Sequence, residues 1–242
     1  MLNGIMSNLM GLFTDIPGLL LRVPVVLLAL TCHEVAHGWV AYKCGDPTAK
    51  SLGRLTLNPL KHLDPIGTIC MFLFGFGWAK PVPINTRYFN KPKQGMALTA
   101  LAGPAANVLL SFLGLFLLET LQRIFLGTGL LAEYGGTLYV MSESSFVANM
   151  VNYSLYFLNL FFQLNIYLAV FNMIPIPPLD GSRVLNIFLP DRIYFGMMRY
   201  EQYIQIILMI ALWSGILTTP LMWVMDKVTG AMIFLIELLP FF

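Results

Sequence analysis

Long uninterrupted runs of apolar residues constrain the fold of this chain more than any other feature of its sequence. Three runs stand out, at residues 17–42, 96–118 and 151–174. Each has about 20 residues or more, enough for an α-helix to cross the hydrocarbon core of a bilayer, which is about 30 Å thick. Two further runs, at 204–217 and 221–239, are separated by a Thr-Thr-Pro sequence and predict a helical hairpin or a pair of spans.

The composition agrees with helices that face lipid. Of the 242 residues, 57% are hydrophobic and 11% are charged, whereas about a quarter of the residues in an ordinary soluble domain are charged. The mean hydropathy is +0.74. The formal net charge of +2 is too small to indicate a nucleic-acid partner, because such a protein concentrates Lys and Arg on one face. We therefore predict a lipid bilayer as the surroundings, and no nucleic acid as a partner.

Charged residues between the apolar runs indicate which helix ends face the cytoplasm. Lys and Arg are concentrated in residues 43–64, 79–93 and 183–199. In residues 119–145, by contrast, the charged side chains are acidic apart from one Arg. Cytoplasmic loops of membrane proteins carry an excess of Lys and Arg. The first three segments are therefore expected on the cytoplasmic side and residues 119–145 on the outer side.

Two segments are too short for a standard span. Residues 66–78 are apolar but number about 13, and both of their flanks are predicted to be cytoplasmic. We expect this run to re-enter the membrane or lie shallow in it, with a compressed span as the alternative. Residues 1–15 lack a basic start, so we expect a short or interfacial helix there and no cleavable signal peptide.

Alternating residues at 80–88 predict a strand, although Pro81 and Pro83 cannot donate a ladder hydrogen bond. The predicted fold is thus an all-α polytopic membrane protein with a short membrane-associated β-hairpin or edge strand. We expect one integral membrane domain over residues 1–242, with no internal repeat and no appended soluble domain.

The sequence HEVAH in the second half of the first run predicts a metal site. His33 and His37 are four residues apart, which places both imidazoles on one helix face within reach of one ion, most simply zinc. Glu34 stands beside such an ion and can accept a proton from water. HExxH also occurs in proteins without metal. A charged group costs about 2.5–3.5 kcal/mol at the centre of a spanning helix, so the membrane context favours a functional site.

Asp180 is the candidate for a third protein ligand, since a catalytic zinc usually has three and one open position. It follows a proline-rich sequence at the end of the third long run, where the helix is broken and backbone can line a cavity. Gly181 allows a tight turn beside it. An Asp-Gly turn that merely ends the helix is the alternative. We expect His62 to organise the polar loop near the metal, with a role as fourth or alternative ligand also open.

Four motifs in order resemble the site-2 protease family of intramembrane zinc metalloproteases, in the compact form without a PDZ or CBS domain. They are HEVAH at 33–37, NPLKHLDPIGT at 58–68, LAGPAAN at 101–107 and FNMIPIPPLDG at 171–181. The resemblance covers residues from about 17 to 190 and implies a three-helix catalytic core there. The two apolar runs beyond it predict additional transmembrane helices, as a hairpin at about 201–240.

The resemblance also implies what the chain does. One zinc ion per chain would be bound by His33, His37 and Asp180, with Glu34 as general base for hydrolysis of peptide bonds within or near transmembrane segments of protein or peptide substrates. Asn107 and Asn172 would hydrogen-bond substrate backbone or steady the site, or else satisfy helix backbone in the bundle. We expect a bacterial or archaeal cell membrane as the location, and the basic segment 183–199 beside Asp180 predicts that the site opens towards the cytoplasm.

Two other functions compete with proteolysis. A metal-ion transporter or channel would repeat its ligands on several spans or in two related halves, and this sequence has no internal repeat. A relative that binds membrane proteins without cutting them would lack Glu34 or a metal ligand, and all of these residues are present.

Overall fold

The computed structural model describes residues 16–65, 67 and 79–239. Within this part of the chain, four helices are long and apolar enough to cross a membrane. They are α2 (Ile16–Lys43), α5 (Pro92–Gly127), α6 (Ser145–Asn172) and α10 (Thr218–Glu237). The prediction of an all-α polytopic membrane protein is confirmed.

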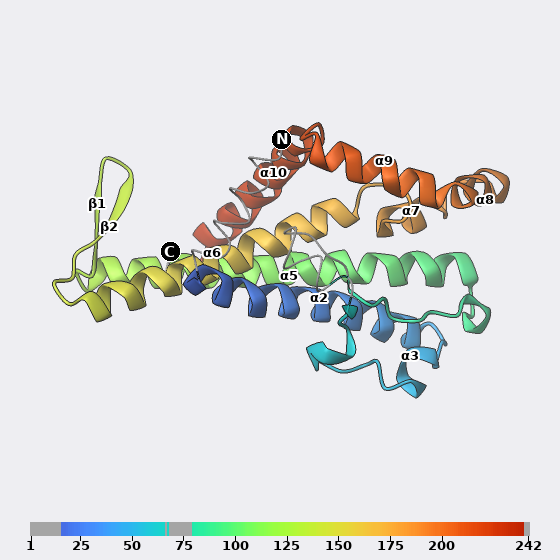
Figure 1. The fold of residues 1–242 in the computed structure, drawn as a ribbon, viewed down its shortest axis with the longest axis horizontal. Coiled ribbons are helices and arrows are strands. Elements are labelled where there is room, and N and C mark those ends of the chain that lie inside the picture. Colours follow the sequence, from blue (N-terminus) through green and yellow to red (C-terminus); the bar gives the residue numbers. More distant parts are fainter. Residues whose placement is uncertain (1–15, 66, 68–78, 240–242) are drawn as a thin grey trace.

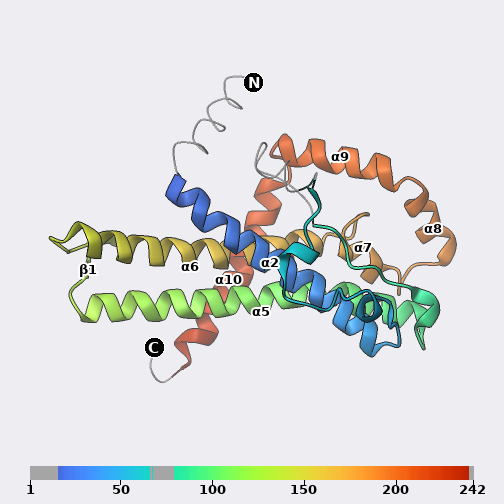
Figure 2. The same ribbon diagram turned by 60° about the horizontal axis from the view of Figure 1, so that its bottom comes forward.

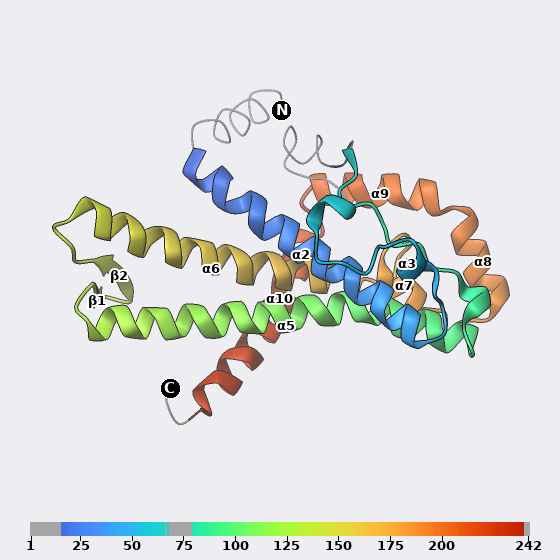
Figure 3. The ribbon, with the colours of Figure 1, turned by 90° about the horizontal axis from the view of Figure 1, so that it is seen from below.

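Helices α2, α5 and α6 pack together in the centre of the molecule (Figures 1 and 3). α5 contacts both of the others, and α2 also contacts α6. Close approach of α5 and α6 depends on Gly114, where an added Cβ would lie 2.8 Å from Phe161 Cδ1 and 3.2 Å from the Phe162 backbone nitrogen. Small residues drive close packing in this way when lipid provides no hydrophobic force between helices.

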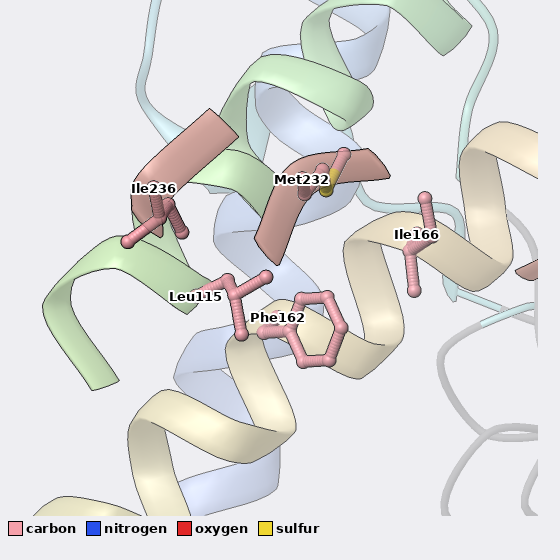
Figure 4. Packing of buried hydrophobic residues seen from close by; sticks show 5 residues of the cluster. All are labelled: Leu115, Phe162, Ile166, Met232 and Ile236. Carbon is pink, nitrogen blue, oxygen red and sulfur yellow. The ribbon is translucent and has the colours of Figure 1, made fainter. Parts of the chain in front are cut away.

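The last spanning helix, α10, crosses α5 and α6 obliquely (Figure 1). A buried cluster forms at the crossing from Leu115 of α5, Phe162 and Ile166 of α6, and Met232 and Ile236 of α10 (Figure 4). α9 (Glu201–Trp213) precedes α10 and, with 13 residues, is shorter than the spans. The run expected to form a C-terminal hairpin or a pair of spans contains α9 and α10, of which α10 alone, among the described residues, is long and apolar enough to span.

The short polar elements gather at one end of the molecule (Figures 1 and 2). They are α3 (Thr48–Ser51), η1 (Pro59–Lys61), η2 (Thr86–Tyr88), α7 (Asp180–Leu185) and α8 (Asp191–Arg199). α7 packs against α5. This is the end at which the basic segments lie, and it also holds the candidate site.

The expected β element exists, but its place in the chain differs from the expectation. β1 (Leu131–Tyr134) and β2 (Thr137–Val140) form an antiparallel hairpin between α5 and α6, at the opposite end from α7 (Figure 1). The stretch 80–88 contains no strand; residues 80–85 are irregular, and Ala79 forms an isolated bridge with Leu63.

Proline explains why the stretch 80–88 does not pair as a strand. Pro81 and Pro83 have no N–H to donate, and the intervening Val82 N–H is hydrogen-bonded to Glu34. The predicted re-entrant run at 66–78 and the first helix before residue 16 lie outside the described residues, apart from Gly67.

Candidate metal centre

Three potential metal ligands from distant parts of the chain converge at the polar end of the bundle. His33 Nε2 and His37 Nε2 lie 2.9 Å apart, and each lies 3.2 Å from Asp180 Oδ2. Both imidazoles are buried. Among the residues that the structure describes, these three form a group of His, Cys, Asp or Glu side chains close enough to hold one ion.

The local sequence explains how the three side chains meet. The two histidines are one helical turn apart on α2, on the face that packs against α5. α6 ends at Asn172, and the following proline-rich turn leads directly to Asp180 at the start of α7. Gly181 lies so close to the carbonyl oxygens of Met173 and Ile174 that a Cβ would overlap both. The tight turn therefore requires glycine and fixes the position of Asp180.

Hydrogen bonds on the far side of each ring determine which nitrogens carry protons. His37 Nδ1 lies 2.6 Å from the Thr99 carbonyl oxygen, which can only accept, so Nδ1 carries the proton and donates. His33 Nδ1 lies 2.6 Å from Asn107 Oδ1. The Asn107 amide nitrogen is used by acceptors elsewhere, so Oδ1 accepts here as well. In their neutral form, both rings therefore present an unprotonated Nε2 to the centre.

These protonation states leave three acceptor atoms facing one another with no donor among them. Two Nε2 lone pairs and the Asp180 carboxylate meet in a buried place, and Asp180 Oδ2 has no hydrogen-bond partner. Such an arrangement is unfavourable unless a cation lies between the atoms. Two neutral imidazoles and one carboxylate are a typical donor set for zinc. The residues therefore fit a zinc ion.

Gly103 of the LAGPAAN motif keeps the space beside the imidazoles open. A Cβ added to it would overlap His37 Nε2 and would lie 2.5 Å from His37 Cε1 and 2.6 Å from His33 Cε1. The sequence alone did not identify the histidine rings as the neighbours of Gly103.

We expect Gly103→Ala to weaken zinc binding by about 10–100-fold, the range typical of changes just outside the ligands. The added methyl group would force one or both rings to tilt away from the common centre. Chelator competition on the purified protein measures the affinity. Gly127→Ala on the same helix is the matched control, because nothing lies within 4 Å of its added Cβ. Equal affinities for the two variants would contradict the expectation.

Glu34 faces away from α5, towards the segment 79–85. Its Oε2 accepts a hydrogen bond of 2.8 Å from the Val82 N–H. Gly38, one turn further along α2, allows this segment to approach, since an added Cβ would lie 3.0 Å from Val82 Cγ1. One turn of α2 thus presents the histidines to α5 and the Glu34 carboxylate to the segment 79–85.

The segment 79–85 is held at several points along its length. Lys80 N–H donates to the His62 carbonyl oxygen at 2.8 Å, and Arg54 Nη2 donates to the carbonyl oxygens of Lys80 and Pro81 at 2.8 and 3.3 Å. At the other end, Asn85 N–H donates to Asp46 Oδ2 at 2.6 Å. The segment therefore gives Val82 a fixed position from which to hold Glu34.

The other predicted residues lie in different places relative to this centre. Asn107 is fully buried beside His33. Asn172 Nδ2 donates to the Leu168 carbonyl oxygen of its own helix at 3.0 Å. This bond is the alternative stated for Asn172 above, in which the side chain satisfies helix backbone. His62 is buried and lies 2.9 Å from the Thr56 carbonyl oxygen through Nε2; it is not part of the three-residue group. Sequence reasoning missed Asn165, which contacts Asn107.

Comparisons with known proteins agree with this geometry. The family model of peptidase family M50 matches residues 23–217. A Bacillus subtilis protein named "Putative zinc metalloprotease YwhC" is 41% identical over 181 residues, which are 75% of this chain and 74% of that protein.

More distant relatives carry the same description in their names. Rip2 of Mycolicibacterium smegmatis is 28% identical over 66% of this chain and 54% of its own length. MJ0611 of Methanocaldococcus jannaschii is 32% identical over 64% of this chain and 63% of its own length. No solved structure gives a significant match. With the family model matching most of the chain, this protein belongs to peptidase family M50, the site-2 protease family, and is a zinc metalloprotease of the membrane.

Proposed function

We propose that this protein hydrolyses peptide bonds within or near transmembrane segments of membrane protein or peptide substrates, with one zinc ion held by His33, His37 and Asp180. The observation that carries this proposal is that His33 Nε2, His37 Nε2 and Asp180 Oδ2 meet within 3.2 Å of one another in a buried place. The three atoms lie in a bundle of helices that are long and apolar enough to span a membrane. Glu34, which follows His33 on α2, supplies a carboxylate next to them.

Zinc in such a site supplies a Lewis acid, which polarises a carbonyl group and lowers the pKa of water to about 7. Glu34 accepts the proton of the attacking water and delivers it to the amine that leaves. The Val82 N–H donates to Oε2 of Glu34 and so holds this carboxylate in position. The hydrogen bonds of Thr99 and Asn107 hold the imidazole rings in place during this transfer.

A substrate must be unwound at the bond that is cut, because the carbonyl groups of an intact helix are already hydrogen-bonded and shielded by side chains. The segment 79–85 is not a ready pairing edge for an unwound substrate. Its prolines lack an N–H, its Val82 N–H is bound to Glu34, and Arg54 occupies two of its carbonyl groups. We infer that this segment borders the site and positions Glu34.

The site opens towards the cytoplasm in this proposal. α2 runs into Lys43 at its end, and the polar elements that surround the site carry many of the basic residues. Residues on this side follow the positive-inside rule. β1, which carries Glu133, lies at the opposite end of the bundle (Figure 2), where the outer face of the membrane would be.

One specific observation weighs against an ion transporter. The ligand group found among the described residues is a single compact cluster on α2 and α7, whereas a permeation path would place ligands at successive depths along several spans. A binding protein without catalytic activity is disfavoured by the Glu34 carboxylate beside the histidines.

A cleavage assay with metal removal tests the proposal. Purified protein in liposomes is expected to cut some members of a panel of single-span peptides at positions within or near their apolar segments. Dialysis against a chelator should abolish cutting, and stoichiometric zinc should restore it, because the two imidazoles and Asp180 give the ion three protein ligands. Cutting that persists in metal-free protein would refute a zinc mechanism.

A further inference from the structure

A buried chain of hydrogen bonds connects His33 to a residue on α6 that has no contact with the metal centre. Asn107 Oδ1 lies 2.6 Å from His33 Nδ1. Asn107 Nδ2 lies 2.8 Å from Asn165 Oδ1, and Asn165 Nδ2 lies 2.8 Å from the Phe161 carbonyl oxygen. Both asparagines are 0% exposed. Three helices, α2, α5 and α6, are joined by this chain.

The last acceptor in this series of hydrogen bonds determines which group donates in each of the earlier ones. The Phe161 carbonyl can only accept, so the amide NH₂ of Asn165 must point towards it. Asn165 then presents its oxygen to Asn107, whose NH₂ must donate. Asn107 in turn presents its oxygen to His33, which must carry its proton on Nδ1. In the neutral ring, His33 Nε2 then has a lone pair that faces the metal centre.

An asparagine amide has two orientations of nearly the same shape, and only one of them suits His33. If the Asn107 amide rotated by half a turn, its NH₂ would face His33 Nδ1 and favour the tautomer with a proton on Nε2. That proton would occupy the ligand position. The Ala29 carbonyl lies 3.4 Å from Asn107 Nδ2, near the upper limit for a hydrogen bond, so the shorter bond to Asn165 contributes most to the orientation.

We infer that Asn165 is a positioning residue, which orients the Asn107 amide and through it keeps His33 in the tautomer that binds zinc. The inference rests on the zinc site of the proposed function. It differs from a role in helix packing alone, because packing requires only that the two amides stay paired. Tautomer control requires an acceptor at position 165 that faces the Asn107 NH₂.

Two substitutions of equal shape separate these roles. In Asn165→Thr, the hydroxyl group can donate to the Phe161 carbonyl four residues back and accept from Asn107. Asn165→Val has the same outline without the acceptor. We expect Asn165→Val to bind zinc about 10–100-fold more weakly than Asn165→Thr, measured by chelator competition on purified protein. The absorption spectrum of the cobalt-loaded protein should change in the same variant.

A second set of variants tests which groups donate and which accept in this series of hydrogen bonds. An aspartate at position 107 offers an oxygen to His33 in either orientation, so Asn107→Asp combined with Asn165→Val should recover most of the lost zinc affinity. Asn159→Val is the matched control on α6, since Asn159 pairs with Gln163 near the surface. It is expected to bind zinc as the unchanged protein does.

The outcomes separate this inference from the proposed function. If the unchanged protein binds no zinc, both fail together. If it binds zinc and Asn165→Val and Asn165→Thr bind it equally well, the inference alone is overturned. It is also overturned if Asn107→Asp restores no affinity, because the amides then act only in packing. Asn165→Ala, which likewise removes the acceptor, replaces Asn165→Val in these comparisons if that variant does not fold.

Discussion

Glu34→Gln is expected to slow peptide hydrolysis by about 10²–10⁴-fold, the contribution typical of a general base, while zinc binding stays unchanged. The glutamine amide has nearly the same shape, and its oxygen can still accept the hydrogen bond from the Val82 N–H that Glu34 accepts at 2.8 Å. It cannot take a proton from water near neutral pH. Comparison of kcat/KM on a cleaved peptide, together with zinc content per chain, measures both parts of the expectation.

Two further variants control this comparison. Glu133→Gln makes the same chemical change on β1, at the opposite end of the bundle, where the side chain is exposed, and should cut as the unchanged protein does. Glu34→Asp keeps the carboxylate but shortens its reach to Val82, so an intermediate rate is expected. Full activity of Glu34→Gln with bound zinc would show that another group serves as base.

The helices and the grouping of the three candidate metal ligands could be predicted because each depends on a short stretch of sequence. A run of apolar residues implies a span by its length alone, as for α6 at Ser145–Asn172. The spacing of His33 and His37 implies a shared helix face. Asp180 could be identified as a candidate ligand only through the proline-rich motif before it. A single sequence does not show that the start of α7 lies beside the histidines of α2.

The parts that escaped prediction depend on how helices are rotated about their axes. Asn107 and Asn165 are 58 positions apart, and Asn107 and His33 are 74 apart. In lipid, apolar faces point both outward and inward, so hydrophobic periodicity does not reveal which face of a helix is buried. Asn165 and Asn172 therefore look alike in sequence, and only the packed structure shows that Asn165 is the one joined to the centre.

The segment 79–85 shows a different limit. Its alternating residues predicted a strand, and the two prolines within it argued against pairing. The structure resolves this conflict through contacts from outside the segment: Arg54 and Asp46 bind it at its two ends. Glu34 of α2, which is half-buried, accepts a hydrogen bond from Val82, the one residue between the prolines and the one with an N–H. Local propensity contains no information about such partners.

Asp180→Asn is expected to weaken zinc binding by about 100-fold or more, beyond the effect of residues that only support the ligands, and to abolish hydrolysis at limiting zinc. The amide keeps the size of the side chain and leaves the tight turn at Gly181 intact, but a neutral oxygen replaces the anionic ligand. Only the two imidazoles would then remain as strong ligands. Because Asp180 Oδ2 has no hydrogen-bond partner, its negative charge is compensated chiefly by the ion.

Zinc should also separate the two proteins by their thermal stability. Without zinc, Asp180 Oδ2 lies 3.2 Å from Nε2 of each histidine, and a ring that takes up a proton there can donate it to the carboxylate. Zinc replaces that proton and binds the anionic oxygen, so it should stabilise the unchanged protein far more than Asp180→Asn, which lacks the anionic ligand. Asp226→Asn, an exposed carboxylate on α10, is the control. If zinc raised the Tm of Asp180→Asn and of the unchanged protein equally, Asp180 would not be a ligand.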